Sequence, residues 1–172
     1  MKKLFMPFIM ATVLLACSGP AEKKAETTET ATSGSVTTTG PDVELIKKAA
    51  ESWAKGDWDA YLSCYADTAV SVHNAWATND TTVAKKMPSF IDLFKKSRVP
   101  MDGNINIDNA IYEVVTMPNG NKYGHAWVGI SWKLKTGEVS KTVLFNSFGI
   151  KDGKITYEWP IYNPKEFDKL TK

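Results

Sequence analysis

The sequence has few cysteines and histidines and no marked excess of either charge. Its 172 residues include two cysteines and two histidines, and 21 basic side chains stand against 19 acidic ones. Two cysteines form at most one disulfide, which excludes a disulfide-rich scaffold. The near balance of charge, without a block of like charges, argues against nucleic acid as a partner. No metal-ligand spacing accompanies the histidines, so the sequence predicts no metal and no cofactor.

The chain also lacks an apolar run long enough to cross a bilayer. Residues 4–16 are largely apolar, but they contain Pro7 and fall short of the roughly 20 residues that span the hydrocarbon core. A basic start at Lys2 and Lys3, a short apolar segment and small residues at its end are typical of a secretory signal peptide. We therefore predict a signal peptide at residues 1–16.

The end of this segment, Leu14-Leu15-Ala16-Cys17, resembles the lipobox of bacterial lipoproteins. The resemblance implies cleavage before Cys17, lipidation of its thiol, and a location in the bacterial cell envelope with the lipid as membrane anchor. A plain signal peptide with an incidental cysteine is the alternative. Loss of Lys2 and Lys3 would leave equal numbers of basic and acidic side chains.

The composition changes again near Pro41. Residues 18–40 are rich in Thr, Ser, Ala, Glu and Lys and contain no aromatic side chain, so they cannot bury enough surface to offset the entropy of ordering. All six tryptophans and all six tyrosines lie after this stretch. We predict a disordered tether at residues 17–40 and a single domain at residues 41–172.

Three segments in the first half of this domain show helical periodicity. The first begins near Pro41 and ends at Gly56; Asp57 is placed to cap the second, and the third opens at Asp80 or Thr81. The apolar faces of the three are, in order, Val43, Ile46, Ala50 and Trp53; Trp58, Tyr61, Leu62 and Tyr65; and Met87, Phe90, Ile91 and Phe94.

The second half of the domain is predicted to form antiparallel strands. A short strand is predicted at residues 69–76, and residues 104–117 then alternate apolar and polar side chains. Strong turn signals follow at Asn119-Gly120, Thr136-Gly137 and Asp152-Gly153, with possible bulges at Gly124, Gly129 and Gly149. Helices followed by a meander of strands predict an α+β fold with the helices on one face of the sheet.

Two stretches resemble the nuclear-transport-factor-2-like superfamily, in particular its SnoaL-like branch. They are the helix, Gly-Asp turn and strand entry within Ala49–Val70, and the late hairpin Phe148–Ile155. The resemblance implies a cone-shaped fold in which three N-terminal helices pack on a curved antiparallel β-sheet around a pocket. The superfamily uses this pocket for isomerase, cyclase or dehydratase chemistry, or for binding alone, so the fold does not choose the activity.

The resemblance also places His73 where the isomerases of this superfamily carry a base aspartate. An imidazole could act as a general base near neutral pH. A packed histidine without a role is the alternative, and a register shift of one residue would turn Asn74 inward instead.

Glu158 is the second catalytic candidate, because burial among aromatic side chains would raise its pKa and suit it to acid–base work. Strand alternation argues against that orientation. The more apolar of the two alternating sets in this strand consists of Ile155, Tyr157, Trp159 and Ile161. This set is predicted to face the core, so Glu158, which belongs to the other set, is predicted to face solvent.

The remaining candidates are aromatic or amide side chains that could line a pocket for a small molecule. His125 shares its parity with Tyr123 and Trp127 and could face the pocket with them. The predicted pocket residues are Trp53, Tyr61, Tyr65, Asn74, Trp76, His125, Trp127, Phe145, Asn146 and Trp159. The plain alternative is core packing.

Three functional hypotheses follow. The first is a lipid-anchored envelope protein that binds a small apolar or amphipathic ligand, since no complete catalytic set is visible. The second is an isomerase, cyclase or hydrolase that uses His73 as general base. The third is an envelope module that forms a homodimer, or docks another protein, through an aromatic sheet face.

Overall fold

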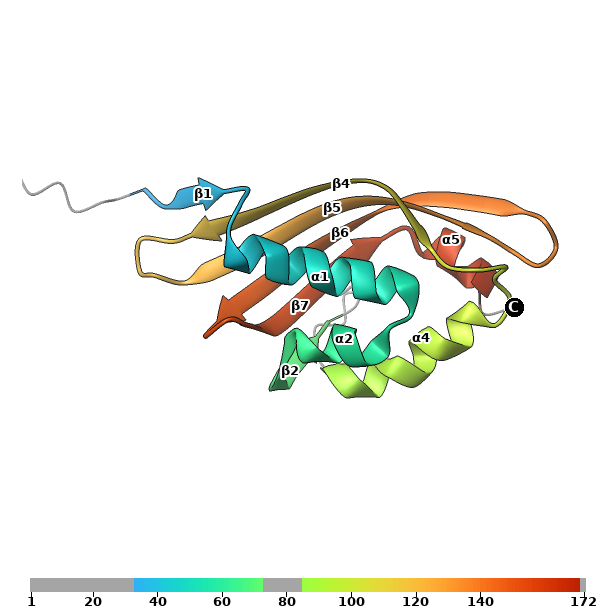
Figure 1. The fold of residues 1–172 in the computed structure, drawn as a ribbon, viewed down its shortest axis with the longest axis horizontal. Helices are drawn as coiled ribbons and strands as arrows, with labels where there is room; N and C mark the ends of the chain where they lie inside the picture. Colours follow the sequence, from blue (N-terminus) through green and yellow to red (C-terminus); the bar gives the residue numbers. More distant parts are fainter. Residues whose placement is uncertain (1–32, 73–84, 171–172) are drawn as a thin grey trace, which may run out of the picture. The chain divides into compact units, whose positions relative to one another are not determined.

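The computed structural model describes residues 33–72 and 85–170. Within these ranges the chain forms helices along one face of a sheet, as Figure 1 shows. The helical segments are α1 (Pro41–Lys55), α2 (Trp58–Ser63), α4 (Ile91–Arg98) and α5 (Pro164–Phe167), with the 3-10 turns η1 (Met87–Phe90) and η2 (Asp168–Leu170). No helix of this described part is long and apolar enough to cross a membrane.

Helix α1 begins and ends where the sequence predicts, and α2 begins where it predicts. Helix α2 ends at Ser63, however, and Tyr65, which was predicted on its apolar face, begins a strand. Pro41 occupies the start of α1, and Gly56 ends it in the left-handed conformation with φ 74°. The carboxylate of Asp57 then accepts a hydrogen bond from the backbone N–H of Ala60 at 3.1 Å and caps α2.

The strands form one mixed sheet in the order β1-β4-β5-β6-β7-β2-β3. They are β1 (Ser35–Thr37), β2 (Tyr65–Ser71), β3 (Lys85–Lys86), β4 (Asn106–Thr116), β5 (Lys122–Lys133), β6 (Val139–Lys151) and β7 (Lys154–Tyr162). Strands β4 to β7 form the predicted antiparallel meander. The fold is α+β, as predicted, with helices packed on one face of the sheet.

The predicted turns are confirmed. Gly120, Gly137 and Gly153 connect the four long strands and take φ values of 82°, 90° and 69°. An L side chain rarely adopts such values, so these glycines determine where each hairpin reverses.

Four features differ from the sequence prediction. Strand β2 begins at Tyr65 rather than at residue 69, and it pairs parallel to β7. Helix α4 begins at Ile91 after a 3-10 turn that contains Pro88, which has no N–H for a regular helix interior, and the helix start predicted at Asp80 or Thr81 lies outside the described residues. The C-terminal helix α5 follows β7. The short strand β1 pairs with β4 and lies within the segment predicted as a tether.

Helix α1 packs closely against the sheet at Gly124. Ile46 is fully buried, and a Cβ at Gly124 would lie 2.9 Å from Ile46 Cγ2. The register at Gly124 is regular, so the bulge predicted there is absent; bulges do occur opposite Gly129 and next to Gly149. Glycine at position 124 therefore lets the helix approach the strand.

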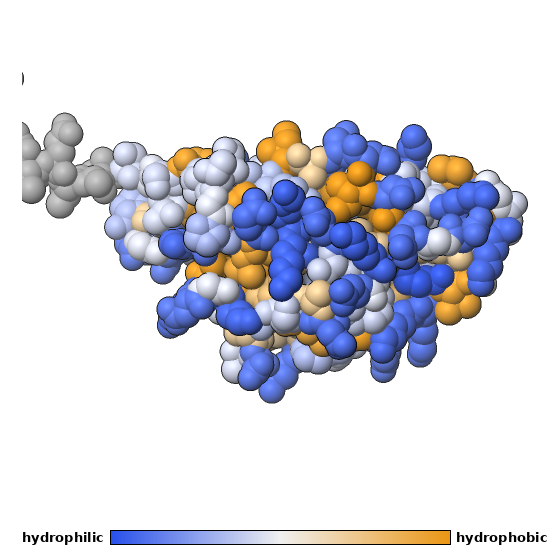
Figure 2. Space-filling view, viewed as in Figure 1, coloured by the Kyte–Doolittle hydropathy of each residue, from blue (hydrophilic) through white to orange (hydrophobic). Residues whose placement is uncertain are grey.

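The two sheet faces have different surroundings. Helices α1, α2 and α4 lie along the inner face, and their outward side is largely hydrophilic with scattered apolar side chains (Figure 2). The core fills the space between these layers and includes Ile46, Val128, Ile130, Trp132 and Phe148.

Candidate functional site

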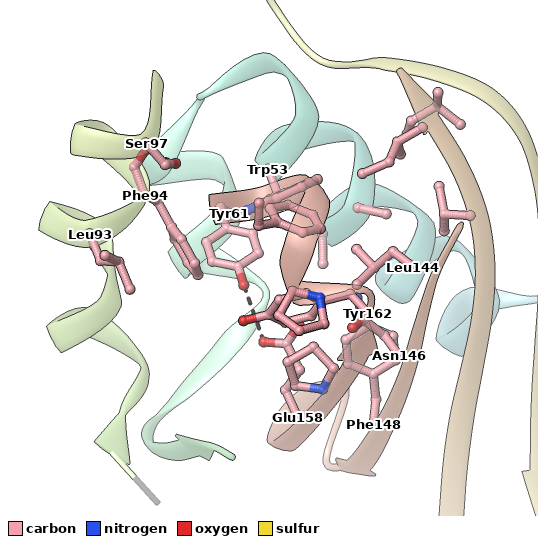
Figure 3. A pocket seen from close by; sticks show the side chains of 18 of the residues that line it. Trp53, Tyr61, Leu93, Phe94, Ser97, Leu144, Asn146, Phe148, Glu158 and Tyr162 are labelled. Atoms are coloured by element: carbon pink, nitrogen blue, oxygen red, sulfur yellow. Dashed lines mark hydrogen bonds between the residues drawn. The ribbon is translucent and has the colours of Figure 1, made fainter. Parts of the chain in front are cut away.

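A cavity of about 210 Å³ remains between the inner sheet face and the helices. Most of its surface is apolar, and α4 forms one wall while β6 and β7 form the opposite one (Figure 3). The lining residues are Ala49, Ala50, Trp53, Tyr61, Tyr65, Leu93, Phe94, Ser97, Ile107, Val128, Ile130, Leu144, Asn146, Phe148, Glu158, Pro160, Tyr162, Pro164, Phe167 and Asp168.

Glu158 provides a buried carboxyl group in this cavity. Its side chain is 5% exposed. The hydroxyls of Tyr61 and Tyr65 donate hydrogen bonds to Oε2 of Glu158 at 3.2 and 3.0 Å, and the two hydroxyl oxygens lie 3.0 Å apart. Helix α2, strand β2 and strand β7 thus each contribute one member of a polar group in apolar surroundings, and Figure 3 shows the Tyr61–Glu158 contact.

Burial changes the ionisation of all three members. It raises the pKa of Glu158 from 4.5 to about 7, while the hydrogen bonds from Tyr65 and Tyr61 oppose that rise. Burial, followed by the nearby Glu158 charge, raises the pKa of each tyrosine well above 10. The carboxyl group therefore titrates near neutral pH while both tyrosines stay protonated as donors.

The inward orientation of Glu158 corrects the prediction from strand alternation. Gly149 pairs with Tyr157 while Ile150 pairs with Ile155, so Thr156 is an extra residue on β7. The hydroxyl of Thr156 donates to the carbonyl of Gly149 at 3.2 Å. This bulge reverses the alternation, and Ile155 and Glu158 both point into the core although they are three residues apart.

Arg98 holds the α4 wall in place. Its guanidinium donates to the carbonyl of Ala54, at 3.0 Å from Nη1, and to that of Trp53, both in the last turn of α1. The same group lies 5.3 Å from the ring centre of Trp53 and 5.6 Å from that of Trp58. A cation at a helix C-terminus and over two indole faces is favourable, so α4 is fixed against α1 and α2.

Asn146 is the second polar side chain on the sheet side of the cavity. It is 6% exposed, and its Oδ1 atom is buried without a hydrogen-bond partner among the described residues. Asn146 pairs with Pro160, so Glu158 and Tyr162 are its diagonal neighbours on β7, and Figure 3 labels all three around the cavity. Buried amide oxygens are almost always hydrogen-bonded in native proteins, to the protein or to ordered water, so an amide oxygen without a protein partner is unusual.

The structure brings five of the predicted site residues together around the cavity: Trp53, Tyr61, Tyr65, Asn146 and Glu158. It places His125, Trp127, Phe145 and Trp159 on the other face of the sheet, which corrects their assignment to the pocket. On β5 and β6 the inward positions are the even-numbered ones, such as Val128 and Asn146. His125 instead lies 3.3 Å from the Glu113 carboxylate, Nδ1 to Oε1, and its ring is 5.9 Å from that of Trp127.

Three further candidates, His73, Asn74 and Trp76, lie outside the described residues. Sequence reasoning also missed several lining residues, among them Leu93, Phe94 and Leu144. Gly149 was the sequence signal that could have predicted the orientation of Glu158. A bulge beside Gly149 that adds one residue to β7 turns Glu158 toward the cavity.

The cavity offers no evident place for a metal ion. Among the described residues, no three His, Cys, Asp or Glu side chains lie close enough together to ligate one. Tyrosine and carboxyl groups next to apolar side chains instead suit an organic molecule with a few polar atoms.

Comparisons with known proteins identify the fold. No family model and no curated protein sequence matches the chain. Several solved structures are similar to the chain. One is a candidate polyketide cyclase from Xanthomonas campestris, which has 17% sequence identity and a TM-score of 0.59 in a match that covers 77% of this chain and 97% of that one. A candidate polyketide cyclase from Streptomyces antibioticus, IdmH, has 12% identity and a TM-score of 0.58 over 77% and 99% of the two chains.

A nuclear-transport-factor-2-like protein from Burkholderia xenovorans shows the same relation, with 12% identity, a TM-score of 0.53, and coverage of 77% of this chain and 96% of that one. At such low identities the likeness concerns the fold alone. The chemistry of the site has to be argued from this chain's own residues.

Proposed function

We propose that this protein binds a small, largely apolar molecule in the cavity and holds a polar atom of that molecule at Glu158. The observation that carries the proposal is a buried carboxyl group, hydrogen-bonded by two tyrosines, in an otherwise mostly apolar cavity. Burying a carboxyl group is costly, and buried titratable groups with perturbed pKa values cluster at functional sites.

The ionisation of Glu158 gives the site two binding modes. Below pH 7 the protonated carboxyl group can donate a hydrogen bond to a carbonyl oxygen of the ligand. Above pH 7 the carboxylate can only accept, so it favours a hydroxyl or N–H group. Ligand affinity should therefore change across neutral pH.

A proton-transfer enzyme is the second candidate, because a carboxyl group with a pKa of about 7 is well suited to general acid–base catalysis at neutral pH. In this alternative Glu158 takes the role that the sequence assigned to His73. The carboxylate would remove a proton next to a carbonyl group, and a tyrosine hydroxyl would donate to the oxygen that becomes negative.

Titration with 2-tetralone, an uncharged bicyclic ketone, tests both candidates. We expect wild-type protein to bind it up to about tenfold more tightly at pH 6 than at pH 8, because only protonated Glu158 donates to the ketone. Glu158→Gln should bind without this pH dependence.

The enzyme candidate is tested by exchange of the ketone α-protons in deuterated water at pH 8, which NMR measures. Catalysis is supported if wild-type protein accelerates this exchange and Glu158→Gln does not. If the ketone binds neither at pH 6 nor at pH 8, the proposed function is contradicted.

The proposal includes a membrane anchor at Cys17, which lies outside the described residues. The lipobox resemblance at Leu14–Cys17 supports it. A diacylglyceryl group on the cysteine would hold the domain at a membrane of the bacterial cell envelope.

Cys17→Ser is expected to abolish lipidation and membrane retention. Detergent phase partitioning and intact-protein mass spectrometry of the full chain measure the two effects. Cys64→Ser is the matched control, because that thiol is buried in the core. Retention of Cys17→Ser with the membrane fraction would exclude the lipid anchor.

The outer sheet face supports a second copy of the chain as partner. Ile111, Trp127, Phe145 and Ile161 are paired in one row across four strands. Three of them are 39% to 63% exposed, which is unusual for large apolar side chains placed side by side. A twofold dimer would cover this row with the same row of the second copy.

Trp127→Asp should convert the dimer to a monomer at micromolar concentration in analytical ultracentrifugation, because a charge would then be buried in an apolar contact. Val99→Asp is the control, since Val99 is 67% exposed at the end of α4. A monomeric wild-type protein would rule out the dimer and leave ligand binding unaffected.

A further inference from the structure

We infer that the ligand is uncharged and carries two hydrogen-bonding groups, one for Glu158 and one for Asn146, on an apolar body. This inference rests on the proposed function and specifies its ligand class. It makes Asn146 a specificity-determining residue.

Asn146 is the first support for this inference. Asn146 is only 6% exposed and lines the cavity. Its Oδ1 atom has no hydrogen-bond partner among the described residues. An amide offers one donor end and one acceptor end, and the two exchange by rotation about χ2. A hydroxyl group satisfies either end, so it is the ligand group best matched to this side chain.

Glu158 is the second support. Both tyrosine hydroxyls donate to Oε2, and among the described residues no hydrogen bond reaches Oε1. Glu158 lines the cavity, so Oε1 is the oxygen available to a ligand. The tyrosines thus orient the carboxyl group while leaving one of its atoms free for recognition.

The placement of the two residues sets the arrangement of the ligand groups. Phe148 on β6 pairs with Glu158 on β7, and Asn146 lies two residues along β6 from Phe148. Asn146 and Glu158 are therefore diagonal neighbours on the inner face, with backbones about 7–8 Å apart. One small molecule can contact both while its body lies against Leu144 and Phe148.

The charge of the lining argues against an anionic ligand. No Lys, Arg or His is present among the described residues that line the cavity, whereas Glu158 and Asp168 are. An anion would lose its hydration without gaining a cationic partner. A neutral molecule avoids that loss.

The site should consequently discriminate by hydrogen bonds rather than by size alone. A ligand without the second polar group leaves Asn146 buried and unpaired, and such a mismatch reduces affinity by about tenfold or more. Replacement of Asn146 by Leu, which is similar in size, removes the need for the second polar group.

Four bicyclic probes of similar size test the inference by tryptophan fluorescence or isothermal titration at pH 8. They are naphthalene, 2-naphthol, 2,6-dihydroxynaphthalene and 2-naphthoate. For wild-type protein we expect affinity to rise by about tenfold with each hydroxyl group and 2-naphthoate to bind most weakly. In Asn146→Leu the second hydroxyl should bring no gain, while the affinity for 2-naphthol should be retained.

The unfolding temperature of the ligand-free protein is an additional readout. Asn146→Leu should raise it, because the variant no longer buries an unpaired amide. Glu158→Gln, the control, should keep the tenfold gain from the second hydroxyl, since that gain comes from Asn146.

The outcomes separate this inference from the proposed function. Equal affinity of naphthalene and its two hydroxyl derivatives for wild-type protein would overturn the inference and preserve ligand binding. Tightest binding of 2-naphthoate would overturn the requirement for an uncharged ligand. Failure of all four probes to bind up to their solubility limits would overturn both the inference and the proposed function.

Discussion

Replacement of Glu158 by Gln is expected to make the protein more stable than wild type at neutral pH but not at pH 4. Glutamine has nearly the same shape and can still accept from Tyr61 and Tyr65, but it has no charge to bury. Burial raises the pKa of Glu158 from 4.5 to about 7 in the folded state. The carboxyl group therefore stays protonated in the folded chain between these values while it ionises in the unfolded chain.

The direction of the pH effect follows from this difference in bound protons. Between pH 4.5 and about 7 the folded state binds one proton more than the unfolded state, so its stability falls as pH rises. Over this interval the wild type should lose about 3 kcal/mol relative to Glu158→Gln, and the difference should be constant above it. Below pH 4.5 both states are protonated and the effect disappears.

Urea unfolding of both proteins from pH 4 to pH 8 measures this difference. Glu44→Gln is the matched control, because the Glu44 side chain is 67% exposed and its substitution should change the free energy of unfolding only slightly. A free-energy difference between wild type and Glu158→Gln that stays constant over the whole range would show that Glu158 ionises as an ordinary glutamate.

Phe148→Ala is expected to lower the free energy of unfolding by about 3–5 kcal/mol. Phe148 is 1% exposed, pairs with Glu158 across the strands and lines the cavity. Its removal enlarges a space that is already partly empty, so the neighbouring side chains cannot close it. Water should then reach the carboxyl group of Glu158 and lower its pKa toward 4.5.

Phe145→Ala is the control for this prediction. Phe145 lies on the same strand, but it is half-buried on the opposite face of the sheet. Its replacement should cost about 1–2 kcal/mol in dilute, monomeric protein. Equal losses for the two variants in chemical unfolding would contradict the assignment of Phe148 to the core and Phe145 to the outer face.

Much of the fold could be predicted from the sequence because its signals are local. Gly56 ends α1 and Asp57 caps α2 through contacts within a few residues. The three glycine turns likewise set the hairpins from their own backbone preferences. The parallel pairing of β2 with β7 was not predictable in this way, since it joins segments that are about 90 residues apart and depends on how the helices return the chain.

The candidate site was predictable only in part. Tyr61 and Tyr65 were predicted as aromatic pocket residues and Asn146 as an amide that could orient a ligand, and all three line the cavity. The orientation of Glu158 was wrong in the prediction, because strict alternation counts every residue of β7 and the bulge at Thr156 adds one. His125 and Trp127 were assigned to the cavity because alternation shows which residues share a face but not which face is covered.

The sequence by itself determined the extent of α1, the start of α2, the three hairpin turns and the α+β class, because backbone preferences and apolar periodicity act over a few residues. Only the tertiary structure decided which sheet face the helices cover and that three polar groups from α2, β2 and β7 meet there. It also decided the pKa of Glu158, since the free energy of ionisation depends on burial and partners that the fold brings together from distant parts of the chain.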